Sequence, residues 1–572
     1  MKFELGHLNA FALALAVTGL GVLAACVSQS PDKQKTAQES KIVLPKDELT
    51  LDKPPAAPPP PEIMMEAPMQ NGAAAGVIGR SMSRARPGYW QPNNTSRFPD
   101  ASPNAVKVVS TDPVSTFSID VDTASYGVVR DYLHNNAMPP ADAVRVEEMV
   151  NYFDYAYAGP ENAKVPFKAT YAVYPTPWNR DTQILHIGIK GFDLPKKARP
   201  PVNLVFLIDT SGSMDEPNKL PLLIDSFHLL VEQLGEKDRV SMVVYAGSAG
   251  VVLEPTSGAD KRKILDALDR LRAGGSTAGG EGIRMAYKLA EDTFVKGGVN
   301  RVLLATDGDF NVGITDPRAL EGFVAGERDK GVELSCLGFG NDNYNDAMMQ
   351  KIAQAGNGNA AFIDTIDEAH KVFVDQVAGT LFTIARDVKI QIEFNPARVA
   401  EYRLIGYETR MLNRTDFNND KVDAGDIGSG HTVTALYEIT PVGSKAVMAD
   451  PLRYSDPAPK PDAELAYLKI RYKLPGETAS HLIQRPITDL DVVGEFSKLP
   501  ADLRFAAAVA GTAQLLRHDP YIRDFGYERA LQIAENAEGA DRFGYRHEFV
   551  DLLRAAQKAD GLKPLDRNRS GG

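Results

Sequence analysis

Hydroxyl and carboxylate side chains that could hold a metal ion occur in three separated segments of this 572-residue chain. They are Asp209, Ser211, Ser213, Thr277 and Asp307. Every ligand in this set is a hard oxygen atom, which suits Mg²⁺, Mn²⁺ or Ca²⁺ and does not suit a soft metal. The sequence therefore predicts one divalent-cation site. Mg²⁺ is the expected ion, and because it keeps several waters we expect few direct protein ligands and one open position.

The elements that must position these residues alternate between strands and helices from about residue 202 to residue 379. Four continuous apolar runs are typical of strands buried on both faces: residues 202–208, 240–245, 302–305 and 334–339. Stretches with one apolar face at helical spacing lie between them. This alternation predicts an α/β domain with a mainly parallel sheet. Asp209 and Asp307 each follow a buried run, at the strand ends where such sheets bind ligands.

The combination of Asp-x-Ser-x-Ser, a threonine in a Gly-rich loop and Asp-Gly after an apolar strand resembles the metal-ion-dependent adhesion site of von Willebrand factor type A (VWA) domains. The resemblance implies that Ser211 and Ser213 bind the metal directly, and Thr277 directly or through water. It implies that Asp209 and Asp307 act chiefly through bound waters, and that a carboxylate of a protein partner fills the open position. Each serine alone would be interpreted more simply as a helix cap. The joint occurrence favours a metal site, because oxygen-rich clusters are costly to assemble without a cation.

The segments around this block carry a second resemblance. Residues 117–125, 146–154 and 394–398 are similar to a family of bacterial lipoproteins in which such regions flank a VWA domain. The similarity covers about residues 110–555. It implies a Rossmann-like VWA domain, with a mainly parallel sheet flanked by helices, inserted between β-rich segments. Helical N-terminal and C-terminal regions complete the expected α/β fold.

Period-2 alternation indicates half-buried strands on both sides of the α/β block, within residues 164–191 and 386–480. We hypothesise that these strands form one sandwich, because the two ends of a compact domain often lie close together. The expected boundaries are 1–25 for a lipoprotein signal peptide, 26–105 for a Pro/Ala-rich disordered tether, 106–200 for an N-terminal VWA-associated region, 201–380 for the VWA domain, 386–480 for the β-rich segment and 500–560 for a helical C-terminal region.

The N-terminus has the features of an export signal. Residues 9–25 are mostly apolar, follow Lys2 and end in Leu-Ala-Ala before Cys26. This ending resembles the lipobox of bacterial lipoproteins, which implies that Cys26 is lipidated. The alternatives are a plain signal peptide cut near Ala25 and an uncleaved membrane helix. The prediction is a protein anchored by lipid in the bacterial cell envelope, on the periplasmic or cell-surface side.

Composition and the remaining motifs argue against several other classes. The formal charge of −12, from 63 basic and 75 acidic residues, argues against nucleic acid as a main partner. The nine histidines and two cysteines form no zinc motif, and Cys336 lies in an apolar run that predicts a small buried hydrophobic residue. Residues 416–420 resemble the start of a calcium loop, and Asp423 and Asp426 follow. However, Lys421 and Ile427 stand where glycine and glutamate are needed. A solvated acidic turn is the favoured interpretation.

These observations predict a binding module and not an enzyme, with an adhesion, interaction or assembly role. The alternative is a metal-dependent hydrolase of the cell envelope, but hydroxyl ligands without a nearby histidine suit binding better than water activation. Acidic residues close in sequence to the ligands predict a rim that repels a purely acidic partner. They are Asp215, Glu216, Glu281 and Asp309. We also hypothesise that the last helix of the domain, at about 367–385, transmits metal occupancy to the flanking sandwich.

Overall fold

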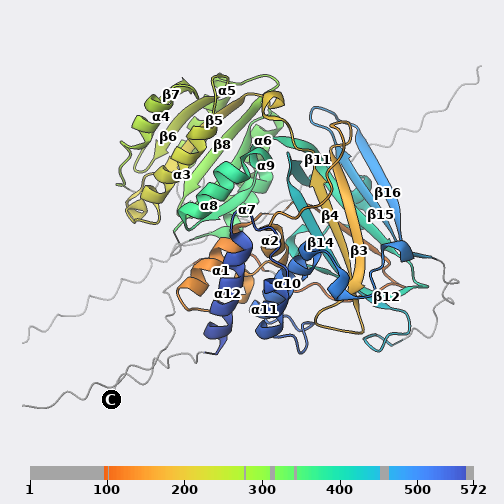
Figure 1. The fold of residues 1–572 in the computed structure, drawn as a ribbon. Coiled ribbons are helices and arrows are strands. Elements are labelled where there is room, and N and C mark those ends of the chain that lie inside the picture. Colours follow the sequence, from red (N-terminus) through yellow and green to blue (C-terminus); the bar gives the residue numbers. More distant parts are fainter. Residues whose placement is uncertain are drawn as a thin grey trace, which may run out of the picture. The chain divides into compact units, whose positions relative to one another are not determined.

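The parallel sheet predicted from the apolar runs is present in the computed structural model (Figure 1). The structure describes residues 96–561, except 101, 121, 276–278, 309–315, 341–343 and 451–462. The strand order is β10-β9-β8-β5-β6-β7, with β7 antiparallel to β6 and the other neighbours parallel. The strands are β5 (Val202–Asp209), β6 (Arg239–Tyr245), β7 (Ala249–Ser257), β8 (Val299–Thr306), β9 (Glu333–Phe339) and β10 (Ala360–Ile363). The expected α/β fold class is confirmed.

Helices cover both faces of this sheet, so β5 is buried at every position. Leu204 and Phe206 pack on one side with α3 and α4, whereas Val205 and Leu207 pack on the other with α5, α6 and α7. The helices are α3 (Leu220–Gln233), α4 (Lys261–Leu268), α5 (Gly279–Asp292), α6 (Pro317–Asp329) and α7 (Asp346–Ala355). Burial of both faces explains why the sequence of β5 is continuously apolar and does not alternate.

The end of the VWA domain differs from the single helix expected at about 367–385. It consists of α8 (Ile366–His370), a π-helical turn (Lys371–Asp375) and α9 (Val377–Leu381), and a strand begins at Thr383. Lys371 in the π turn is buried, and its Nζ donates to the carbonyl oxygen of Tyr152 at 2.6 Å. The expectation of one continuous helix was wrong. The helical spacing of apolar residues in the sequence does not reveal a contact between Lys371 and the distant residue Tyr152.

Two antiparallel sheets enclose a second core formed by strands from both sides of the VWA domain. The first sheet has the order β1-β12-β14-β4-β3, and the second has the order β13-β11-β15-β16 with β2 paired to β11. Their bounds are β1 (Lys107–Val108), β2 (Val114–Ser118), β3 (Phe167–Pro175), β4 (Gln183–Gly191), β11 (Thr383–Phe394), β12 (Val399–Ile405), β13 (Gly425–Gly428), β14 (Thr432–Pro441), β15 (Glu464–Lys473) and β16 (Ser480–Thr488). The VWA domain is therefore inserted between β4 and β11 (Figure 1).

A group of helices from both ends of the described chain covers the outer face of the first sheet. Ile184 of β4 and Leu436 of β14 belong to the same core as these helices, and Phe153 packs edge-to-face on Phe505 and Phe549. The helices are α1 (Ala124–His134), α2 (Val146–Asn151), α10 (Ala501–Leu516), α11 (Tyr527–Glu535) and α12 (Tyr545–Asp560). This cover makes β4 almost fully buried where the sequence suggested half burial. Among the described helices, none is long and apolar enough to cross a bilayer.

Candidate metal centre

Two buried carboxylates lie at the carboxyl ends of neighbouring parallel strands. β5 ends at Asp209, β8 ends one residue before Asp307, and the two strands pair with Ile208 opposite Ala305. Asp209 is 0% exposed and Asp307 is 1% exposed. Parallel pairing thus brings together two acids that are far apart in the sequence, at the edge where α/β sheets bind ligands.

Hydrogen bonds hold the Asp209 carboxylate in place. Its Oδ2 accepts from the Thr306 hydroxyl at 3.0 Å, and its Oδ1 accepts from the backbone N–H of Ser211 at 2.8 Å. Burial raises the pKa of Asp209 to about 6, the bonds from Ser211 oppose the rise, and the charge of Asp307 adds to it. A cation beside this carboxylate would favour its ionised form.

The two serines of the motif present their hydroxyl groups at one place. Ser213 lies in a short 3-10 turn (Gly212–Met214) that follows β5, and Ser211 directly precedes this turn. The Oγ atoms of Ser211 and Ser213 are 3.0 Å apart. Ser211 is buried and Ser213 is exposed. The turn is anchored at Asp209, so both hydroxyl oxygens and that carboxylate belong to one cluster.

The Gly-rich loop is joined to this turn by backbone hydrogen bonds. Gly212 donates to the carbonyl oxygen of Gly275 at 3.0 Å, and Gly274 donates to that of Thr210 at 2.8 Å. Gly275 has a φ of +92°, a backbone conformation that favours glycine. Thr277 lies outside the described residues, two positions beyond this anchored glycine.

The donor set that the structure brings together fits a hard divalent cation. The set offers two carboxylates and two hydroxyls, all oxygen donors, and the buried carboxylates gain from a nearby positive charge. Within the described ranges, no three histidine, cysteine, aspartate or glutamate side chains gather into a metal site of another kind. Asp215, Glu216 and Glu281 are exposed near the cluster in sequence, and Asp309 lies outside the described residues.

Sequence reasoning missed two residues at this cluster, Thr306 and Lys219. Lys219 is buried, and its Nζ lies 3.1 Å from the carbonyl oxygen of Ser213 and 3.5 Å from Oδ2 of Asp307. Thr306 directly precedes Asp307, so its position at the strand end was a usable signal. No motif pointed to Lys219, because a lysine before a helix is ordinarily exposed.

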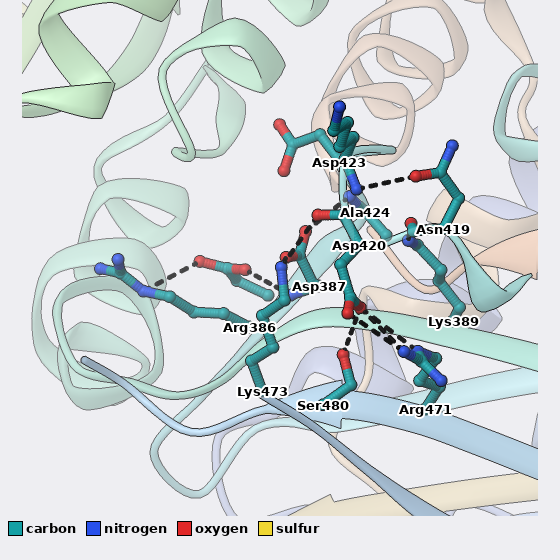
Figure 2. Close-up of polar contacts among 12 residues, drawn as sticks. Arg386, Asp387, Lys389, Asn419, Asp420, Asp423, Ala424, Arg471, Lys473 and Ser480 are labelled. Atoms are coloured by element: carbon teal, nitrogen blue, oxygen red, sulfur yellow. Dashed lines mark hydrogen bonds and ion pairs between the residues drawn. The ribbon is translucent and has the colours of Figure 1, made fainter. Parts of the chain in front are cut away.

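The acidic segment considered as a calcium loop instead forms ion pairs (Figure 2). Asp420 accepts from Arg471 and from the Ser480 hydroxyl, and Asp423 accepts from Nη1 of Arg328 in α6 at 2.6 Å. These side chains already bind cationic partners from the protein. The segment therefore joins the VWA domain to the second sheet through these ion pairs. Cys336 is buried on β9, and burial raises the pKa of its thiol.

Comparison with known proteins assigns these regions to families. Residues 203–375 match the von Willebrand factor type A domain, residues 92–186 match the family described as von Willebrand factor, and residues 379–559 match the family described as Uncharacterized protein YfbK, C-terminal. Uncharacterized protein YfbK of Escherichia coli (strain K12) is 46% identical over 484 residues, which cover 83% of this chain and 82% of that protein. The chain belongs to the YfbK family.

The chain is also similar to proteins outside the YfbK family. Inter-alpha-trypsin inhibitor heavy chain H4 of Homo sapiens is 30% identical over 194 residues, covering 32% of this chain and 21% of that protein. A solved structure of a von Willebrand factor type A protein from Catenulispora acidiphila has 15% identity and a TM-score of 0.39, covering 69% of this chain and 91% of that one. The ArnB paralog VWA2 from Sulfolobus acidocaldarius has 14% identity and a TM-score of 0.34, with coverages of 69% and 98%.

Proposed function

We propose that this YfbK-family protein binds a protein partner through a divalent cation held by Asp209, Ser211, Ser213, Thr277 and Asp307. The observation that carries the proposal is the cluster of two buried carboxylates and two hydroxyls at the ends of β5 and β8. VWA domains serve in protein interaction and adhesion, which supports the same role here. Mg²⁺ is the proposed ion, with Mn²⁺ or Ca²⁺ as alternatives.

The chemistry of the cluster favours binding over catalysis. A bound cation would act as a Lewis acid with one position open to a partner's carboxylate. The hydroxyls of Ser211 and Ser213 would hold it as neutral ligands, so that it keeps much of its positive charge for the partner. The three ligand-bearing segments, residues 209–213, 274–277 and 306–308, contain no histidine that could serve as a general base. We therefore propose a role in adhesion, interaction or assembly, without enzymatic turnover.

The proposed location is the bacterial cell envelope, with the protein anchored by a lipid on Cys26. The support is the sequence, in which an apolar segment ends in Leu-Ala-Ala before that cysteine. Replacing Cys26→Ser is expected to move the protein from the membrane fraction to the soluble fraction of lysed cells. Retention of the variant in the membrane fraction would contradict the lipid anchor and favour an uncleaved helix.

A pull-down from envelope extracts tests the metal-dependent binding. The full chain is expected to retain a partner in Mg²⁺ and to release it in a chelator, and Asp209→Asn is expected to retain none. Asp225→Asn is the matched control, because Asp225 is exposed on α3. If the protein retains its partner equally well in the chelator, the proposal is refuted. Turnover of generic phosphate or ester substrates that Asp209→Asn abolishes would favour the hydrolase instead.

A further inference from the structure

A buried lysine lies beside the carboxylates of the candidate metal centre. Lys219 is 2% exposed and immediately precedes α3. Its Nζ donates to the carbonyl oxygen of Ser213 at 3.1 Å, and lies 3.5 Å from Oδ2 of Asp307 and 3.5 Å from Oε1 of Glu216. The cluster proposed to bind a dication therefore already has one positive charge of the protein's own.

This placement works against the ordinary preferences of a helix and of a charged side chain. The first turn of a helix carries a partial positive charge, which favours acidic residues over lysine at that position. Burial of an ammonium group is also costly unless charged or polar partners surround it. The backbone nevertheless makes room for the lysine. Gly340 has a φ of +74°, and a Cβ at that position would lie 2.7 Å from Cγ of Lys219.

We propose that Lys219 is a fixed positive charge that lowers the affinity of the site for the metal and raises the affinity of the metal-loaded site for a partner's carboxylate. The inference rests on the proposed function. Asp209, Asp307 and Lys219 together carry one negative charge when all three are ionised. Bound Mg²⁺ turns the charge of these three residues into one positive charge, and the exposed carboxylate of Glu216 near Nζ lowers the local charge further. Without the lysine, the loaded site would be one charge more negative.

Exposed acidic residues beside the site make this positive charge important for binding a partner's carboxylate. Asp215 and Glu216 are exposed in the loop between Ser213 and Lys219, so an acidic partner approaches a negative surface. A loaded site without the lysine would attract a carboxylate weakly against this negative potential. Lys219 keeps the loaded site one charge more positive, and it lowers the affinity for the cation. Metal affinity and partner affinity are therefore expected to change in opposite directions when the lysine loses its charge.

Titrations of the full chain with Mn²⁺, followed by electron paramagnetic resonance, test this relationship. Lys219→Met, which keeps an unbranched side chain of similar length and removes the charge, is expected to bind Mn²⁺ roughly tenfold more tightly. Acetate added to the Mn²⁺-loaded protein is the carboxylate probe, and its affinity is expected to fall roughly fivefold in the same variant. Lys219→Arg keeps the charge, so neither the tighter binding of Mn²⁺ nor the weaker binding of acetate is expected in this variant. Lys237→Met is the matched control, because Lys237 is exposed just before the amino end of β6.

The outcomes separate the inference from the function on which it rests. Wild-type protein that binds no Mn²⁺ would overturn both. Wild-type binding with an unchanged or weaker affinity in Lys219→Met would overturn the inference alone, as would a parallel change of Mn²⁺ and acetate affinities. If Lys219 only supports the fold, its replacement by methionine would lower the affinities for Mn²⁺ and for acetate together. If Lys219→Met does not fold, Lys219→Gln carries the same test with a polar neutral side chain.

Discussion

The hydroxyl group of Thr306 donates a hydrogen bond to the buried carboxylate of Asp209, with Oγ1 3.0 Å from Oδ2. The same hydroxyl accepts from the backbone N–H of Gly308 at 3.3 Å, so it links the ends of β5 and β8. Thr306→Val keeps the shape of the side chain and removes both bonds. We expect the free energy of unfolding to fall by about 1–3 kcal/mol, since a buried carboxylate loses a donor.

Urea unfolding in the presence of a chelator measures this loss without a contribution from bound metal. The affinity for Mn²⁺ should also weaken in Thr306→Val, because the orientation of Asp209 is less strictly fixed. Thr306→Ser retains the hydroxyl and serves as the control. Equal stability of wild type and Thr306→Val would show that this hydrogen bond does not support the carboxylate.

Metal removal should lower the thermal stability of the protein. A ligand that binds only the folded state stabilises it by RT ln(1 + [L]/Kd), about 2.7 kcal/mol at one hundred times Kd. The melting temperature of the wild type should therefore rise with added Mg²⁺ and fall in a chelator, as scanning calorimetry can measure. Asp307→Asn should show little of this dependence. A melting temperature indifferent to Mg²⁺ and Mn²⁺ would argue against the metal site.

Arg130 joins α1 to the end of the VWA domain and to α12 through a buried set of ion pairs. Its side chain is 1% exposed, and it bonds to Asp364, to Glu368 at 2.7 Å and to Glu548 at 3.3 Å. Arg130→Met should lower the free energy of unfolding by roughly 3–5 kcal/mol, because it leaves buried carboxylates without their partner.

The matched control for Arg130 is Arg328→Met, measured by the same urea unfolding. Arg328 pairs with Asp423 at 2.6 Å, but the two side chains are 22% and 46% exposed. Exposed pairs contribute only about 0–1 kcal/mol, so this variant should be nearly as stable as the wild type. If the free energy of unfolding falls equally in Arg130→Met and Arg328→Met, burial of the ion pairs does not explain the large loss expected for Arg130→Met.

Lys371 should make the stability of the protein rise with pH above neutrality. Burial lowers its pKa from the ordinary 10.5 to about 7, although the charges of Glu368 and Asp154 oppose this shift. Between these two values the unfolded chain holds a proton on Lys371 that the folded protein has released. Stability therefore increases with pH across this window, by at most about 1.4 kcal/mol per pH unit.

Urea unfolding at pH 7, 8 and 9 measures this slope. Lys371→Met should have a smaller slope than the wild type, whereas Lys263→Met, at an exposed position of α4, should keep the wild-type slope. Comparison of slopes separates the titration of Lys371 from the packing change that the substitution also causes. Identical slopes in Lys371→Met and wild type would show that Lys371 stays protonated in the folded protein.

The strands that are buried on both faces were the most predictable part of the fold. The run at 202–208 has no polar interruption except Asn203, and β5 occupies it. β7 was missed because most of its residues are exposed or half-buried, which leaves no regular pattern. The pairing of β4 with β14 spans the whole VWA domain, and periodicity within a strand contains no information about so distant a partner.

The candidate site was predictable where chemistry and spacing coincide. Asp209, Ser211 and Ser213 form a local motif, and Asp307 follows a strand that the sequence predicted separately. Lys219 could not be found in this way, because its position depends on a side chain turning back from the start of α3 toward Asp307. Thr277, Cys26 and the tether up to residue 95 lie outside the described residues, and their roles stay predictions. The last part of the expected tether, residues 96–105 except 101, is described, and Asn104 donates from Nδ2 to the carbonyl oxygen of Leu404 at 3.1 Å.

The insertion of the VWA domain between β4 and β11 places β14, the partner strand of β4, beyond the whole inserted domain. The parallel sheet is built from one continuous stretch of chain, so it can close as soon as that stretch is available. β4 must wait for β14 to reach it from beyond the inserted domain, and its outer face is covered only when the last helices arrive. Maturation of the N-terminal half therefore depends on the C-terminal end of the chain, and a protein shortened there would expose a sheet that is otherwise covered.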